Sequence, residues 1–278
     1  MEKVLLHTPE GVRDVYGKEC AVKLTIENSI NKVFNIYGYH NIQTPTFEFF
    51  DIFSKERGSV ASKNLYKFFD REGNTLVLRP DVTPSIARLV AKYYMDVKVP
   101  VKLCYNANTY INNSELQGKL KENTQLGCEL INDDSVEADA EILALVVDSL
   151  KAAGLKEFLV EIGHADFYKG LLEECGFDTE NEQELRKRIE NKNYFGVEEI
   201  LDNNNITGQL KEAFLKLPEL FGSIDVIKSA KELTDNKKAL QSIERLEKLY
   251  SILEDYGVSK YAPVIAALLK NPPLVLPH

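Results

Sequence analysis

Two short runs of this sequence carry polar residues that could together bind a small charged molecule. One run is LRPDVT at residues 78–83, and the other is QLGCE at residues 125–129. One carboxylate with neutral acceptors can hold an α-ammonium group, while a second, buried carboxylate can accept a hydrogen bond from an imidazole N–H and favour its protonated form. If the runs are neighbours in the fold, the set fits a zwitterionic amino acid; if they are not, these residues are solvated strand ends. The candidates are Asp81, Thr83, Gln125 and Glu129.

The first run is expected at the junction between a β-hairpin and a helix. Residues 67–70 and 75–78 flank a polar turn that contains Gly73, which is typical of a hairpin. Thr83 followed by Pro84 suits the N-cap and the first position of a helix. Asp81 and Thr83 are therefore expected at a helix N-terminus.

The second run lies in an expected strand, residues 124–131, which follows another expected strand at residues 99–107. Side chains alternate between the two faces of a strand, so Gln125, Gly127 and Glu129 share one face. The glycine leaves a gap at the centre of this polar face. The pattern predicts a floor on which a small polar ligand could lie.

Further elements are expected around the two runs. Apolar residues recur at helical spacing over residues 18–37 and stop at Gly38, and an extended segment at residues 41–45 ends in a proline. Asp134 followed by Glu137 is similar to a capping box that starts a helix. A helix is thus expected before the two runs in the sequence, and another after them.

The second half of the chain is predicted to be helical. Residues 158–162 have strand character, but after about residue 178 the composition changes to Asn-, Lys- and Glu-rich helical pieces that end in a long helix at residues 236–256. We therefore expect a core domain at residues 1–177. Residues 178–278 are expected to form a helical subdomain together with a truncated C-terminal part of the core.

The composition is typical of a globular protein with an acidic surface. The 43 acidic residues outnumber the 34 basic ones, and no cluster of five or six Lys or Arg is present, which argues against a nucleic-acid partner. The four cysteines lie far apart in sequence without metal-ligand spacing, which predicts reduced thiols and no metal site. No run is long and apolar enough for a signal peptide or a membrane helix, so the chain is expected in the cytoplasm.

The order of these features resembles the catalytic domain of histidyl-tRNA synthetase, a class II aminoacyl-tRNA synthetase. The resemblance spans most of residues 8–165 and rests on Pro45, the LRPDVT run, the QLGCE strand and the helix near Asp134. It implies an α/β (α+β) fold in which a mainly antiparallel sheet is flanked by helices. It also implies a homodimer formed through the Pro45 region.

The same resemblance implies a role for each candidate residue. Asp81, Thr83 and Gln125 would contact the amino group of bound histidine, and Glu129 would contact its imidazole. Asp81 is shorter than the glutamate that the family usually has, so its reach to the ammonium group differs.

The sequence departs from the synthetases where they activate ATP. In those enzymes an arginine preceded by an aromatic residue grips the α-phosphate of ATP and the amino-acid carboxylate, and a glutamate two residues later assists. Here Tyr110 keeps the aromatic residue, but Ile111 and Asn113 replace the other two. An aliphatic side chain cannot form the bidentate charge-assisted hydrogen bonds that stabilise charge developing on phosphorus. We therefore expect no catalytic residues, no cofactor and no enzyme activity.

Within this family the chain resembles the regulatory subunits of ATP phosphoribosyltransferase, which take part in histidine biosynthesis. Residues 116–120 (LQGKL) are similar to a motif typical of that group. The resemblance implies that histidine is the effector, that the partner is a short-form catalytic subunit under allosteric control, and that a homodimer forms within a hetero-oligomer. Residues after Tyr261 do not resemble the continuation that supplies further strands in relatives, so a short C-terminus with an exposed strand edge is expected.

Two alternatives stay open. A histidyl-tRNA synthetase fragment, or a related amino-acid-activating enzyme, would exchange pyrophosphate with ATP, which Ile111 opposes. A scaffold that has lost ligand binding would hold the catalytic subunit without taking up histidine.

Overall fold

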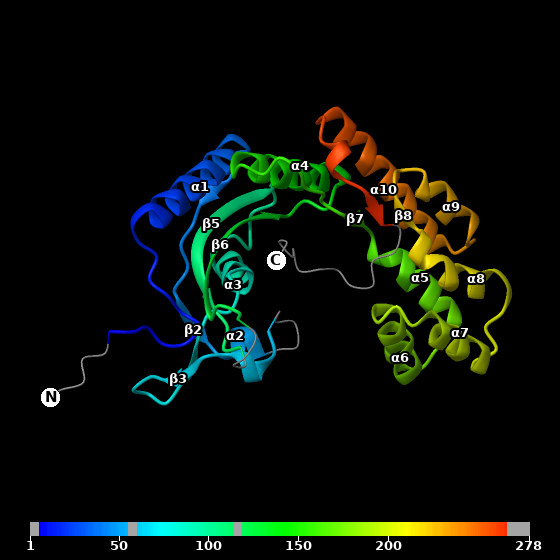
Figure 1. Ribbon diagram of the computed structural model, residues 1–278, viewed down its shortest axis with the longest axis horizontal. Coiled ribbons are helices and arrows are strands. Elements are labelled where there is room, and N and C mark those ends of the chain that lie inside the picture. Colours follow the sequence, from blue (N-terminus) through cyan, green and yellow to red (C-terminus); the bar gives the residue numbers. More distant parts are fainter. Residues whose placement is uncertain (1–5, 55–59, 114–117, 266–278) are drawn as a thin grey trace. The chain divides into compact units, whose positions relative to one another are not determined.

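The computed structural model describes residues 6–54, 60–113 and 118–265 (Figure 1). Compactness divides the chain into two units, Met1–Asp133 with Asp148–Leu155, and Asp134–Val147 with Lys156–His278. The expected mixture of helices and mainly antiparallel strands is confirmed, although the strands form three separate three-stranded sheets. The domain boundary predicted near residue 177 stays a prediction.

The first unit begins with helix α1 (Gly17–Ile36) and a sheet of strands β1 (His40–Asn41), β5 (Val101–Tyr110) and β6 (Glu122–Ile131). Gly38 follows α1 with φ +81°, which glycine adopts without strain, so the predicted helix end is confirmed. In the order β1-β5-β6, β1 is parallel to β5 and β5 is antiparallel to β6. The two long strands that the sequence predicts thus pair along their whole length.

A second sheet in this unit has the order β2-β4-β3 and is antiparallel throughout. Its strands are β2 (Phe47–Phe49), β3 (Lys67–Phe69) and β4 (Thr75–Leu78). Strands β3 and β4 form the predicted hairpin. A short helix α2 (Asp51–Ser54) and a 3-10 turn (Ser62–Asn64) connect β2 to β3.

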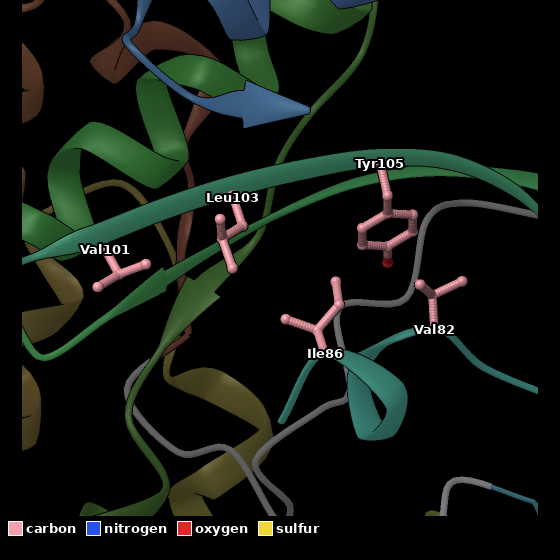
Figure 2. Close-up of a cluster of buried hydrophobic side chains, with 5 residues drawn as sticks. All are labelled: Val82, Ile86, Val101, Leu103 and Tyr105. Atoms are coloured by element: carbon pink, nitrogen blue, oxygen red, sulfur yellow. The ribbon is translucent and has the colours of Figure 1, made fainter. Parts of the chain in front are cut away.

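Helix α3 (Thr83–Tyr93) covers one face of the β5–β6 pair, and α1 lies on the opposite face (Figure 1). Figure 2 shows the apolar contact: Leu103 and Tyr105 of β5 point toward Ile86 of α3 and toward Val82, which precedes this helix. Burial of side chains of this size contributes roughly 1.5–3 kcal/mol each. This cluster therefore fixes α3, and the residues at its N-terminus, against the sheet.

The second unit is mostly helical, and the helical pieces that the sequence predicts after about residue 178 lie in it. Its helices after residue 156 are α5 (Ala165–Cys175), α6 (Thr179–Glu190), α7 (Tyr194–Asn203), α8 (Gly208–Lys216), α9 (Val226–Glu232) and α10 (Lys237–Asp255). Asn236 caps α10 by accepting a hydrogen bond from the Ala239 amide, and its side-chain amide donates to the Gly170 carbonyl of α5 at 3.0 Å. The predicted long helix at residues 236–256 is confirmed, and its N-cap also joins it to α5.

Helix α4 (Val136–Ala152) begins in the second unit, but its cap differs from the predicted one. The hydroxyl of Ser135 accepts the Ala138 amide at 3.1 Å, so Ser135 and not Asp134 caps the helix. Arg245 of α10 donates to Asp139 of α4 at 2.6 Å. The acidic first turn of α4 therefore pairs with α10.

The third sheet has the order β7-β9-β8 and corrects two expectations. The strand predicted at residues 158–162 is confined to β7 (Ile162–Gly163). Beyond Tyr261, where no further strand was expected, β9 (Val264–Ile265) lies between β7 and β8 (Phe221–Gly222). Val264 and Ile265 thus form the middle strand of this sheet.

None of the described helices combines the length and the apolar character that a membrane span requires.

Candidate ligand-binding site

Three of the four candidate residues meet where α3 begins. The Thr83 hydroxyl donates a hydrogen bond to a carboxylate oxygen of Glu129 at 2.7 Å, and the Thr83 amide donates to the Asp81 carboxylate at 3.2 Å. Val82 occupies the N-cap position, so Thr83 is the first helical residue and not the predicted N-cap. Its hydroxyl therefore donates to Glu129 of β6 and does not cap the helix.

The fourth candidate, Gln125, lies further along the same face of β6. Gln125 pairs with Ala107 and Glu129 pairs with Leu103, so both side chains project toward α3. Gln125 and Glu129 are four positions apart along the strand, about 13 Å at the usual rise. A ligand that touches all four candidates must extend along β6.

The glycine gap predicted at Gly127 is filled by Tyr105. The two residues are register partners, and a Cβ atom added to Gly127 would lie 2.4 Å from the Tyr105 hydroxyl oxygen and 2.5 Å from its ring carbon Cζ. The predicted floor for a ligand is therefore wrong at this point, because a buried phenol covers it. Tyr105 is the site residue that the sequence analysis missed.

The electrostatics of the site are those of crowded acids. Burial raises the pKa of Glu129, the hydrogen bond from Thr83 opposes this shift, and the negative charge of Asp81 adds to it. Burial, and then the charges of Glu129 and Asp81, also raise the pKa of Tyr105, so the phenol stays protonated at neutral pH. Such a cluster favours a ligand that brings a positive charge.

Contacts of two arginines, the partly buried Arg88 and the buried Arg79, hold the elements that carry these residues. Arg88 of α3 donates from two nitrogens to the carboxylate of Glu48 in β2, with the shortest contact at 2.7 Å. Arg79 is 6% exposed and donates to three main-chain carbonyls: Asn108 at 2.8 Å, Thr44 at 2.8 Å and Pro45 at 3.1 Å. The arginine of the LRPDVT run is thus a structural residue that joins three chain segments.

Ile111 follows strand β5, where the resemblance to synthetases would place an arginine. Its amide donates to the Lys121 carbonyl at 2.9 Å, and its carbonyl accepts the Asn113 amide at 2.9 Å. The Lys121 stem lies against Gly11, where an added Cβ would be 2.7 Å from the Lys121 Cγ. Leu116 and Gln117 of the LQGKL motif lie outside the described residues.

Within residues 6–54, 60–113 and 118–265, no group of three or more His, Cys, Asp or Glu side chains is arranged to hold a metal ion.

Comparison with known proteins places this geometry in a family context. The family model described as histidyl-tRNA synthetase matches residues 11–269. A protein of Ruminiclostridium cellulolyticum named ATP phosphoribosyltransferase regulatory subunit is 45% identical over 98% of this chain and 65% of its own length. One of the same name from Thermoanaerobacter pseudethanolicus is 39% identical over 96% of this chain and 69% of its own length. The chain therefore spans about two thirds of the length of these curated relatives.

Solved structures agree with the family match. A Bacillus halodurans protein described as an ATP phosphoribosyltransferase regulatory subunit/histidyl-tRNA synthetase superposes with a TM-score of 0.87 at 35% identity, covering 96% of this chain and 70% of the other. Histidyl-tRNA synthetase from Nostoc has a TM-score of 0.78 at 17% identity, covering 97% of this chain and 63% of the other. The second likeness concerns the fold alone. The predicted class II synthetase-like fold is confirmed.

Proposed function

Because this chain belongs to the family of ATP phosphoribosyltransferase regulatory subunits and has the fold of histidyl-tRNA synthetase, we propose that it is a non-catalytic regulator of histidine biosynthesis. Its partner is a short-form ATP phosphoribosyltransferase catalytic subunit. L-Histidine is the effector and binds at Asp81, Thr83, Gln125 and Glu129.

The observation that carries the proposal is the contact between Thr83 and Glu129 at the start of α3. Glu129 is half-buried, and besides burial its pKa is influenced by the Thr83 hydroxyl and by another carboxylate, Asp81. An imidazolium N–H donating to Glu129, together with an ammonium group near Asp81, would supply the positive charge that this cluster favours. Thr83 is exposed, so a ligand can approach from solvent.

The non-catalytic part of the proposal rests on Ile111. Its aliphatic side chain offers no charge to a phosphate, and its backbone is engaged with Lys121 and Asn113. Stabilising the charge of a phosphoryl transition state requires positioned cations, and arginine is the side chain that does so bidentately. Histidine can therefore occupy the site without being adenylated.

Regulation imposes a thermodynamic condition on the complex. Histidine inhibits only if the inactive arrangement of the two subunits binds it more tightly than the active arrangement does. By linkage, the factor by which histidine disfavours the active arrangement equals the factor by which the active arrangement weakens histidine binding.

Changing Glu129 to Gln tests the proposed site. We expect saturable uptake of L-histidine by the unchanged chain and an affinity about ten- to a hundredfold weaker in Glu129→Gln, because a hydrogen bond to a charged group contributes roughly 1.5–3 kcal/mol. Isothermal titration measures this. Glu122→Gln is the matched control, since Glu122 is on the same strand but projects to the opposite face.

If Glu129→Gln lost histidine binding because it unfolded, its free energy of unfolding would be lower than that of the unchanged chain. The burial of Glu129 predicts the opposite. Burial raises the pKa of Glu129, so the ionised carboxylate destabilises the fold at pH values above that raised pKa. Glu129→Gln should be at least as stable as the unchanged chain near pH 7, with an advantage that shrinks as the pH falls through the raised pKa and is gone below the unfolded pKa of glutamate.

Other outcomes of the titration select the alternatives. If the unchanged chain takes up no histidine but still binds and activates the catalytic subunit, the chain is a scaffold. If it exchanges pyrophosphate with ATP in a histidine-dependent manner, it is an amino-acid-activating enzyme despite Ile111.

The same proposal includes a homodimer formed through the Pro45 region, in which β2 follows the proline. Phe47 and Phe49 project outward from this strand and are 52% and 55% exposed. Phe49 and Phe68 flank Leu76 in one cross-strand row, and the Phe47 and Phe68 rings pack edge to face at 5.9 Å. An exposed aromatic face of this kind is a common feature of protein interfaces.

Phe49→Ser is expected to raise the dissociation constant of the dimer about thirtyfold, because an aromatic residue at the centre of an interface contributes about 2 kcal/mol. Sedimentation equilibrium measures the constant. The control Phe195→Ser removes a more exposed ring, 81% against 55%, from α7 and should leave the dimer unchanged. Equal effects of both variants, or none, would contradict an interface at β2.

A further inference from the structure

Two cysteines that are distant in the sequence face each other directly in the sheet below the candidate site. Cys104 of β5 and Cys128 of β6 are register partners in the antiparallel pair. Opposite residues in such a pair project to the same face. Both thiols therefore lie on the face that α1 covers, to which the Asn106 side chain also projects to donate to Glu27 of α1.

The hydrogen bonds of β5 tell which kind of pair this is. The Cys104 carbonyl accepts the Ile42 amide at 2.9 Å, and the Tyr110 amide donates to the Arg79 carbonyl at 2.9 Å, so the even-numbered residues of β5 direct their backbone groups away from β6. The Ile111 amide, by contrast, donates to Lys121 on the β6 side. Cys104 and Cys128 thus form a non-hydrogen-bonded pair, the position where side chains of antiparallel strands approach most closely.

This position satisfies the distance requirement of a disulfide. Residues of a non-hydrogen-bonded pair have Cα atoms about 4.5 Å apart, and disulfides occur with Cα separations of roughly 4.4–6.8 Å. All four cysteines of the chain are free thiols in this structure. Closing the bond between Cys104 and Cys128 requires rotation of side chains and no change of register.

We propose that Cys104 and Cys128 form a redox-active pair that takes a low-molecular-weight disulfide, such as oxidised glutathione, as its oxidant. The thiolate of the half-buried Cys128 attacks the oxidant and releases one reduced thiol, leaving a mixed disulfide. The Cys104 thiolate then displaces the second reduced thiol and closes the Cys104–Cys128 bond. Two protein thiols are oxidised, and one disulfide is reduced to two thiols.

The environment of Cys104 fits the second role and not the first. Its side chain is fully buried, its sulfur lies 3.5 Å from the Asn41 side-chain oxygen, and burial raises the pKa of its thiol. A buried thiol with a raised pKa reacts slowly with solutes but can resolve a mixed disulfide formed beside it.

The bond would join the two residues that directly precede the site residues Tyr105 and Glu129. Cys104 is followed by Tyr105, and Cys128 is followed by Glu129. Fixing the two strands at this point would restrict the movement of Tyr105 relative to Glu129. A change in histidine affinity on oxidation rests on the proposed function, whereas formation of the bond does not.

The test uses the full chain in its folded state, treated with oxidised glutathione at mildly alkaline pH and then alkylated. Trypsin cleaves after Lys102, Lys119, Lys121 and Lys151, which places Cys104 and Cys128 on separate peptides. We expect these peptides to be joined, an intact chain that has lost two hydrogen atoms, and full reversal by dithiothreitol. Recovery of both peptides unlinked, alkylated or as separate glutathione adducts, overturns the proposal.

Variants separate the two roles. Cys104→Ser should accumulate a stable glutathione adduct on Cys128, and Cys128→Ser should leave Cys104 unmodified. Cys175→Ser is the control and should cross-link like the unchanged chain. Histidine titration of the oxidised chain is read separately: an unchanged affinity removes the link to the ligand site, while the cross-linked peptide stands on its own.

Discussion

Arg79→Met is expected to lower the free energy of unfolding by about 3 kcal/mol or more. The methionine keeps most of the volume but donates no hydrogen bond, so the carbonyls of Asn108, Thr44 and Pro45 lose a buried donor. Each buried group left without its partner costs roughly 1–3 kcal/mol. For a chain of this size the melting temperature should fall by roughly 6–12 °C.

Urea denaturation followed by circular dichroism measures the change. Arg71→Met is the control, because Arg71 lies exposed in the turn of the same hairpin. If both variants unfold at the same urea concentration, the carbonyl contacts of Arg79 contribute little and the junction is held by apolar packing alone.

Gly127→Ala is expected to destabilise the first unit by roughly 1–3 kcal/mol and to weaken ligand binding at the same time. The added methyl group would lie 2.4 Å from the Tyr105 hydroxyl oxygen, far inside van der Waals contact. Tyr105 is 4% exposed and packed on Ile86, so its ring must displace neighbours and cannot move into solvent. Overpacking of this kind typically costs that amount.

A double-mutant cycle isolates the cause. Tyr105→Ala removes the ring that the methyl group would meet, so adding Gly127→Ala to Tyr105→Ala should cost much less than adding it to the unchanged chain. Urea denaturation of the four proteins gives the coupling free energy. Additive effects would mean that Gly127 is needed for its backbone and not for contact with Tyr105.

The elements around the site could be predicted where the signal is local. The hairpin that contains Gly73, the helix end at Gly38 and the alternation along β6 each follow from residues within one element. The start of α3 was also predicted, but the role of Thr83 was not. Its hydroxyl suits an N-cap by type, and only the position of Glu129, 46 residues later, shows that it is used elsewhere.

Tyr105 could not be identified because its importance depends on register. A tyrosine in a strand is ordinary, and a glycine in a strand suggests open space or close approach without saying what approaches. The sequence does not tell how many residues between Tyr110 and Glu122 belong to the connection, so it does not determine which residues of β5 and β6 face each other. The same register places Cys104 opposite Cys128, which their separation in the sequence hid.

The third sheet was missed for a different reason. Strands β7, β8 and β9 have two residues each, too few for a period of two to be visible. Their pairing is decided by long-range packing. Residues 262–265 have no strand pattern of their own, yet Ile162 and Phe221 flank β9.

Strand β2 is three residues long, and its two faces make different contacts. Glu48 points inward to Arg88 of α3, while Phe47 and Phe49 point outward. Only the backbone of β2 and the Glu48 side chain separate a molecule bound to the outer face of β2 from α3, the helix that begins at Thr83. If such contact shifts β2, it changes how tightly a ligand is held at Thr83, and ligand binding must change the strength of that contact by the same factor. The assembly state and the ligand affinity would then both depend on the position of β2. Ligand affinities of two samples could be compared only at the same assembly state, and assembly states only at the same ligand concentration.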